Sequence, residues 1–128
     1  MKIKTVELTG AALDWAVAES LGHTPVYNMK SHGMVWRGWW ERTPKTPTGE
    51  YRRLESYSTD WSLGGPILVE DMIMYSYAFG LFWTWLHDDP EGDRNPRASG
   101  PTLLVAIARC RVASKLGDEV DIPEELLQ

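Results

Sequence analysis

The residues whose types and spacing could bind a ligand are concentrated in residues 57–71, with the sequence YSTDWSLGGPILVED. Ser58, Thr59 and Asp60 can each cap a helix, because their side-chain oxygens accept hydrogen bonds from free backbone N–H groups. Residues 64–66, Gly-Gly-Pro, predict the end of a first turn and the start of a second helix. Two helix N-termini side by side would present N–H groups and partial positive charge to a phosphate or carboxylate.

The densest aromatic and cationic stretch is residues 36–40, with the sequence WRGWW. In strand geometry Trp36 and Gly38 share one face, whereas Arg37 and Trp39 share the other. One interpretation is an edge strand packed into the core or into an oligomer interface. The other is a stacking platform for a base or nicotinamide-like ring, with Arg37 near a phosphate.

Arg109 lies in a long apolar segment, PTLLVAIARCRVASKLG, which predicts a helix with Pro101 in its first turn and Gly117 at its end. An arginine in such surroundings needs a carboxylate or an anionic ligand, and Asp60 is the expected partner. The candidate ligand-binding residues are therefore Trp36, Arg37, Trp39, Asp60, Trp61, Gly64, Gly65, Thr102 and Arg109.

Motifs for catalysis or metal binding are missing from the sequence: it has no HExxH, P-loop, GxGxxG or nucleophile elbow, and no His or Cys pairs at metal-ligand spacing. Asp60 and His87 are conceivable as an acid and base pair, but nothing in their spacing supports it. We therefore expect a protein that is not an enzyme and that needs no metal or cofactor.

Composition limits the class of protein. At 128 residues, with 43% hydrophobic and 24% charged residues, the sequence predicts a single globular domain over residues 1–128. The net charge of −5 argues against binding to duplex nucleic acid. The sequence has no apolar run long enough to cross a bilayer and no signal-peptide core, so we expect a cytoplasmic protein that does not bind membranes.

The pattern of apolar residues predicts the elements that would position these groups. Residues 11–22 have helical spacing, residues 26–36 predict a hairpin, and residues 72–79 and 82–87 predict a second hairpin joined by Gly80-Leu81. Residues 43–54 and 88–100 have loop composition. We expect an α+β fold: a small antiparallel sheet of about four or five strands with two main helices on one face. Seven Trp and five Tyr favour homo-oligomerisation, which would cover spare aromatic surface.

Three separated segments carry a resemblance to a known family. LTGAALDWAVA, YSTDWSLGGPI and SGPTLLVAIARCRVASKLGDEVDIPEEL are similar, in this order, to the NinX-like family of small bacteriophage proteins. The resemblance implies an accessory phage protein in the host cytoplasm and no settled biochemistry. The matching residues include Asp14, Asp60, Trp61 and Arg109, which indicate turns, caps and one arginine rather than a catalytic set.

The preferred hypothesis is a non-enzymatic binder of a small anionic, nucleotide-like ligand. Since accessory phage proteins often counter host defences, its concrete form is a sponge that sequesters a cyclic nucleotide or a cyclic ADP-ribose. The rival is a protein-interaction module that inhibits or redirects a host enzyme through exposed aromatic residues. A third hypothesis is modulation of recombination or replication through single-stranded DNA, which Trp stacking favours and the acidic charge opposes.

Overall fold

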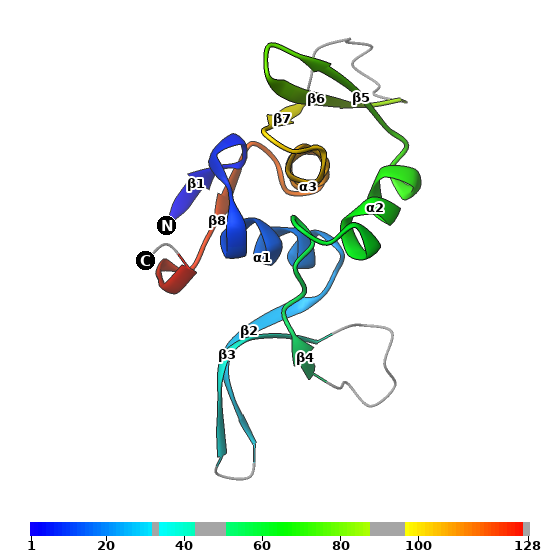
Figure 1. Cartoon of the computed structure of the whole chain (residues 1–128). Coiled ribbons are helices and arrows are strands. Elements are labelled where there is room, and N and C mark those ends of the chain that lie inside the picture. The colour runs from blue at the N-terminus through cyan, green and yellow to red at the C-terminus, as the bar shows by residue number, and fades with distance from the viewer. Residues whose placement is uncertain (32–33, 43–50, 88–96, 127–128) are drawn as a thin grey trace.

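The computed structural model describes residues 1–31, 34–42, 51–87 and 97–126, with the backbone alone for residues 24–31, 34–42, 51–53 and 125. The predicted α+β class is confirmed (Figure 1). In chain order the described elements are β1 (Lys2–Lys4), η1 (Thr5–Glu7), α1 (Gly10–Ser20), β2 (Thr24–Ser31), β3 (Met34–Arg42), β4 (Tyr51–Arg53), α2 (Trp61–Glu70), β5 (Ile73–Ala78), β6 (Leu81–Leu86), β7 (Ala98–Gly100), α3 (Leu103–Leu116), β8 (Glu119–Asp121) and η2 (Glu124–Leu126).

The described strands form three small antiparallel sheets, where we expected one sheet of about four or five strands. Their orders are β1-β8, β2-β3-β4 and β5-β6-β7. Each predicted hairpin forms its own sheet with one further short strand. Figure 1 shows the β2-β3-β4 sheet extending away from the rest of the molecule, whereas β5-β6-β7 lies over α3.

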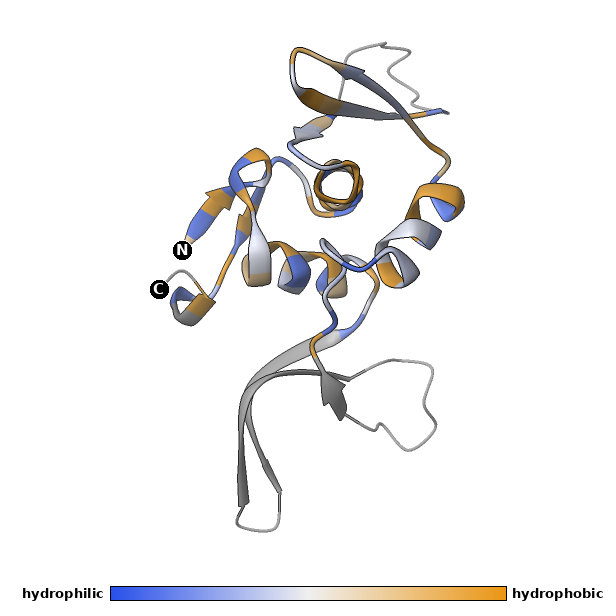
Figure 2. Ribbon diagram, viewed as in Figure 1, coloured by the Kyte–Doolittle hydropathy of each residue, from blue (hydrophilic) through white to orange (hydrophobic). Residues whose placement is uncertain are grey.

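Helix α3 occupies the centre of the fold. It packs against α1 and α2 and against the sheet strands β6 and β7 (Figure 1). Its apolar sequence is explained by this position, because a helix covered on several sides needs apolar residues on several faces. Ala106, Ile107, Ala108, Cys110 and Val112 are all buried. Figure 2 shows apolar segments both on α3 and on the β5–β6 hairpin at the rim of the molecule.

Helix α1 confirms the prediction from apolar spacing. Leu13, Ala16 and Val17 are fully buried, and Gly22 follows the helix with φ 82°, a conformation that glycine adopts readily. The segment before α1 contains a short strand and a helical turn: β1 pairs with β8, and η1 follows β1.

The β5–β6 hairpin is also confirmed, but its turn lies one residue earlier than predicted. The register pairs Ala78 with Leu81, so the two turn residues are Phe79 and Gly80. Both have positive φ, 55° and 78°, as a type I′ turn requires. Because Phe is unusual at a position with positive φ, the residue types in this hairpin did not predict a turn at Phe79.

Candidate functional site

Asp60 is the N-cap of α2, as predicted. Its carboxylate accepts hydrogen bonds from the Ser62 backbone N–H at 2.9 Å and from the Ser62 hydroxyl at 2.7 Å. The Ser62 hydroxyl, and secondly the Ser62 N–H, hold the pKa of Asp60 below its usual value. The start of α2 therefore carries a carboxylate of the chain itself, at the position where an anionic ligand would bind.

The predicted second helix start at residues 64–66 is wrong, because α2 runs without a break from Trp61 to Glu70 with Pro66 inside it. Gly64 N–H donates to the Asp60 carbonyl at 2.9 Å, an ordinary helical bond. A Cβ on Gly64 would clash with the Tyr57 carbonyl oxygen and lie 2.8 Å from Leu104 Cδ2. Gly64 thus permits α2 to pack against the first turn of α3, and it does not break the helix.

Trp61, Gly65, Pro66 and Val69 form an exposed surface that we call the α2 face. Trp61, Gly65 and Val69 are spaced by four residues and so share one side of the helix. Trp61 is 55% exposed and Val69 is 72% exposed. A Cβ on Gly65 would lie 3.1 Å from Trp61 Cε3, so the indole rests on Gly65 while much of the ring remains open to solvent.

Thr102 is the N-cap of α3, and its hydroxyl accepts a hydrogen bond from the Val105 N–H at 3.2 Å. The prediction that Pro101 lies in the first turn of this helix is wrong. Pro101 precedes the cap, and Gly100 ends strand β7. A Cβ on Gly100 would lie 2.9 Å from Val105 Cγ1 and 3.0 Å from the Ala106 nitrogen, so this glycine allows the strand to pass close to α3.

Arg109 is buried and does not pair with Asp60, so this predicted ion pair is wrong. Its Nε donates to the Leu8 carbonyl at 2.9 Å, and its Nη1 donates to the Ser99 carbonyl at 2.8 Å. Burial lowers the pKa of Arg109. The guanidinium therefore hydrogen-bonds to one backbone oxygen before α1 and to another in β7, and these bonds fix both segments to α3.

Arg111, also on α3, does meet a carboxylate, and sequence reasoning missed this pair. Its Nη1 lies 2.6 Å from Asp71 Oδ1, and the two side chains are 12% and 9% exposed. Its Nη2 also donates to the Ser20 carbonyl at 2.9 Å. This pair ties α3 to the C-terminal ends of α1 and α2. The two residues are 40 positions apart, and this spacing alone does not predict a pair.

Asp14 is a second anchor that sequence reasoning missed. This buried side chain in α1 accepts a hydrogen bond from the Ser58 N–H at 2.8 Å. Burial raises the pKa of Asp14, and hydrogen bonds from Ser58 act in the opposite direction. The only signal in the sequence was the presence of Asp14 among the residues shared with the phage family. Its role is to hold the turn that leads into α2.

The predicted residues therefore fall into separate groups. Asp60 caps α2, Trp61, Gly64 and Gly65 lie on that helix, Thr102 caps α3, and Arg109 is a buried residue of α3. The backbone of Trp36, Arg37 and Trp39 lies in β3, and their side chains fall outside the described residues, so the stacking platform stays a prediction.

The conceivable acid and base pair of Asp60 and His87 is not assembled. Asp60 precedes α2, whereas the His87 N–H donates to the carbonyl of Met72, which follows the other end of that helix. The 10 residues of α2 separate the two ends by about 15 Å at 1.5 Å per residue. Among the described residues, no group of three or more His, Cys, Asp and Glu could hold a metal ion.

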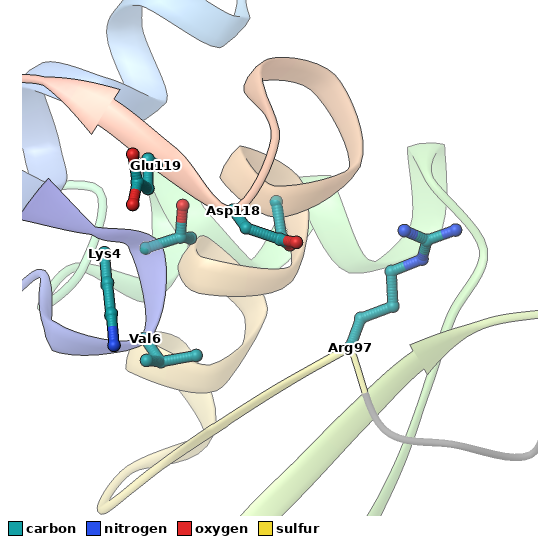
Figure 3. A pocket seen from close by; sticks show the side chains of 7 residues that line it. Lys4, Val6, Arg97, Asp118 and Glu119 are labelled. Carbon is teal, nitrogen blue, oxygen red and sulfur yellow. The ribbon is translucent and has the colours of Figure 1, made fainter. Parts of the chain in front are cut away.

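A small pocket lies elsewhere on the molecule, between η1, the end of α3 and the start of β8. It has a volume of about 170 Å³ and is lined by Lys4, Thr5, Val6, Arg97, Ala113, Asp118 and Glu119. Figure 3 shows the side chains of Lys4 and Arg97 pointing in different directions, so they do not converge on one anion. None of the nine predicted residues lines this pocket, and its volume is below the range of roughly 300–1,000 Å³ for small-molecule sites.

Comparisons with known proteins give one family. Within the described part of the chain, the helices are too short or too polar to span a bilayer. A search of curated proteins finds no match to this chain. The family model described as Bacteriophage P22, NinX matches residues 4–115. Because this match extends over most of the 128 residues, the chain belongs to the bacteriophage P22 NinX family.

Proposed function

We propose that the chain is a phage accessory protein that binds a host protein in the cytoplasm of the infected cell and catalyses no reaction. The observation that carries the proposal is the α2 face, where Trp61 is exposed on a helix whose other side packs against α3. Tryptophan is enriched among the few residues that dominate the binding energy of protein interfaces. A host enzyme bound in this way would be inhibited or redirected.

The electrostatics of the α2 face favour a protein over a small anion. The Asp60 carboxylate occupies the start of the helix and would repel a phosphate there. Arg109, the cation expected at this site, has its Nε and Nη1 hydrogen-bonded to backbone carbonyls. An uncharged helix side with a large aromatic ring matches the usual centre of a protein interface, which is apolar and depleted of charge.

A nucleotide-like ligand is a second candidate, and one observation favours it. The indole of Trp61 is supported by Gly65 and open to solvent, which suits the stacking of a base. A sponge for a cyclic nucleotide or a cyclic ADP-ribose would take its cation from Arg37, with Trp36 and Trp39 as further stacking groups. The net charge of −5 disfavours the single-stranded DNA hypothesis.

Pull-down from host lysate with matched variants tests the first proposal. Trp61→Ser and Val69→Ser change the α2 face, while Met74→Ser changes an exposed apolar residue on β5. We expect one host protein to be retained by the wild type and by Met74→Ser but lost with Trp61→Ser and Val69→Ser. A partner retained equally by all four proteins would exclude the α2 face.

Native mass spectrometry and a thermal-shift screen separate the second candidate from the first. A bound nucleotide would add a discrete mass, and a ligand at 100 times its Kd stabilises the folded state by about 2.7 kcal/mol. The same ligand should give no shift with Trp61→Ser if the indole stacks on it. If the protein shows no added mass and no thermal shift with cyclic dinucleotides or ADP-ribose derivatives, the nucleotide hypothesis fails and the host-protein hypothesis remains.

A further inference from the structure

Among the described strands, β5 lies at an edge of its sheet, since the order is β5-β6-β7. The His87 N–H donates to the Met72 carbonyl at 3.0 Å, and antiparallel pairing alternates from there. The backbone N–H and C=O groups of Met74, Ser76 and Ala78 therefore point toward β6 and hydrogen-bond with it. The N–H and C=O groups of Ile73, Tyr75 and Tyr77 point outward, where another strand could pair with them.

The sequence of β5, IMYSYA, has none of the features that protect an edge strand from pairing. It contains no Lys, no other charge and no Pro. Three of its side chains are also partly exposed: Tyr75 is 52% exposed, Met74 is 44% exposed, and Tyr77, whose ring contacts Phe82, is 64% exposed. Both the backbone edge and the apolar side chains of β5 are therefore available for the same partner.

The two residues that flank β5 have an unusual backbone conformation. Met72 has φ 52° and Phe79 has φ 55°, and these are the non-glycine residues with positive φ in the described part of the chain. This region costs about 1–2 kcal/mol for an ordinary L-residue, so Gly or Asn is usual there. Met72 is 52% exposed and Phe79 is 97% exposed, so packing within the chain explains neither side chain.

We infer that β5 pairs with β5 of a second copy of this chain, antiparallel about a two-fold axis near Tyr75, which joins two three-stranded sheets into one of six strands. An isologous contact needs a self-complementary surface, and an uncharged strand with symmetric outward groups provides one. Ile73 of one copy would face Tyr77 of the other. Met72 and Phe79 would extend the apolar contact beyond the paired residues.

The charges near β5 are compatible with this arrangement. Glu70 and Asp71 precede the strand, and residues 72–80 carry no charge. In the antiparallel pair, each acidic end lies against the uncharged Phe79 turn of the other copy. The two acidic ends are then separated by about 25 Å at roughly 3.4 Å per residue, which limits repulsion between two chains that each have a net charge of −5.

The available area is sufficient for a dimer. Aromatic side chains bury roughly 150–250 Å² each when fully covered. If the exposed parts of Tyr75, Tyr77, Phe79, Met72 and Met74 were all covered, the two copies together would bury at most about 1,000–1,200 Å². Specific interfaces begin at about this size.

Sedimentation equilibrium of the full chain tests the inference. We expect a species of twice the chain mass of 14.5 kDa, and we expect Tyr75→Lys/Tyr77→Lys to weaken self-association by about 100-fold, since like charges across an interface cost several kcal/mol. Val69→Lys is the matched control, because it places the same charge on an exposed residue of the α2 face. A wild-type monomer at high micromolar concentration, or a dimer lost in Val69→Lys and retained in the double variant, would overturn the inference.

A cysteine variant tests the same contact without depending on the fold of the double variant. Cys110, the one cysteine of the chain, is buried, so Tyr75→Cys introduces an accessible thiol. At the two-fold axis the paired Cα atoms would lie about 5.5 Å apart, within the usual range for a disulfide. We expect mild oxidation to give a covalent dimer with Tyr75→Cys and not with Val69→Cys. The reverse pattern would contradict pairing through β5, and neither result depends on the host partner proposed for the α2 face.

Discussion

Helix α3 and strand β5 differ in how far their side chains are buried and bonded within the chain. On α3 even the two arginines are hydrogen-bonded within the chain. Arg109 donates to two backbone carbonyls, and Arg111 donates to Asp71 and to the Ser20 carbonyl. On β5, Tyr75 and Tyr77 extend into solvent. A polar group that is buried must be satisfied, whereas an apolar group can stay exposed at modest cost. The exposed apolar surface of β5 is therefore where we propose that a second copy binds.

The backbone shows the same contrast. Helix α3 starts at the Thr102 cap and ends at Gly117, which has φ 97°, so both ends use residues suited to their conformation. Strand β5 starts after Met72 and ends before Phe79, and both are residues poorly suited to a positive φ. Local stability alone would favour Gly or Asn at these two positions. This difference supports the proposal that the residues around β5 are suited to a contact between copies rather than to local stability.

Removing Arg109 should have the largest effect on the α3 side of this comparison. Arg109→Leu leaves the Leu8 and Ser99 carbonyls without their donors in a buried place. We expect a loss of about 2–4 kcal/mol in the free energy of unfolding, measured by urea denaturation. Lys115→Leu on the exposed side of the same helix should change the free energy by less than about 0.5 kcal/mol. Equal effects of the two substitutions would show that these bonds do not stabilise the fold.

Filling the close contact between α2 and α3 should have the next largest effect. Gly64→Ala places a Cβ against the Tyr57 carbonyl and Leu104, and we expect a loss of about 2–3 kcal/mol in the free energy of unfolding. Gly65→Ala meets only the edge of the exposed Trp61 ring at 3.1 Å. Since that ring can shift and Ala favours a helix, we expect a change of less than about 1 kcal/mol. A thermal or urea melt measures both variants. A larger loss of stability for Gly65→Ala than for Gly64→Ala would contradict this packing.

Asp14 gives a pH-dependent prediction. Because burial raises its folded-state pKa, the native chain binds more protons than the unfolded chain at pH values just above 3.8. The contribution of Asp14 to stability is therefore most favourable at low pH and declines as the pH rises through the raised pKa. Asp14→Asn should remove this decline while it keeps an acceptor for the Ser58 N–H.

Asp14→Ala separates the hydrogen bond from the charge. It leaves the Ser58 N–H without its acceptor, so we expect a loss of about 1–3 kcal/mol in the free energy of unfolding at neutral pH. Urea melts of the wild type and both variants across a pH series provide the measurement. A wild-type curve parallel to that of Asp14→Asn would rule out the raised pKa as a contribution to stability.

Sequence reasoning succeeded where a pattern within one segment determines the structure. The spacing of Leu13, Ala16 and Val17 defined α1, and alternation defined the β5–β6 hairpin. It failed at residues 64–66, because Gly-Gly-Pro has the same composition whether the glycines make a turn or a close helix contact. Only the position of Leu104 on α3 decides between these, and that position is a property of the tertiary fold.

The candidate site was harder to predict than the fold. The N-cap Asp60 was among three candidates, because capping acts over three residues, whereas the N-cap Thr102 was missed because the helix was expected to start at Pro101. The partner of an arginine is set by residues up to 101 positions away, as between Arg109 and Leu8, so its pairing with Asp60 was a guess about tertiary contacts. The exposure of Trp61 could not be predicted from helical spacing either, because the spacing shows which residues share a face but not which face other elements cover.

The smallest expected effect, and the one with the opposite sign, comes from the turn of β5. Phe79→Asn creates an Asn-Gly pair, the sequence most favoured in a type I′ turn, at a residue that is 97% exposed. We expect a gain of about 0.5–1 kcal/mol in the free energy of unfolding of the monomer, since the backbone strain of Phe is relieved and no buried contact is lost. A thermal melt at a concentration below self-association measures this gain, and Phe82→Asn, which removes a partly buried ring on β6, should instead destabilise the chain. If recognition is the reason for Phe79, the same substitution must also weaken the β5 contact in sedimentation, so that stability rises while association falls. A loss of monomer stability would mean that Phe79 is held in place by contacts within the chain, and the contrast between α3 and β5 would then no longer extend to this turn.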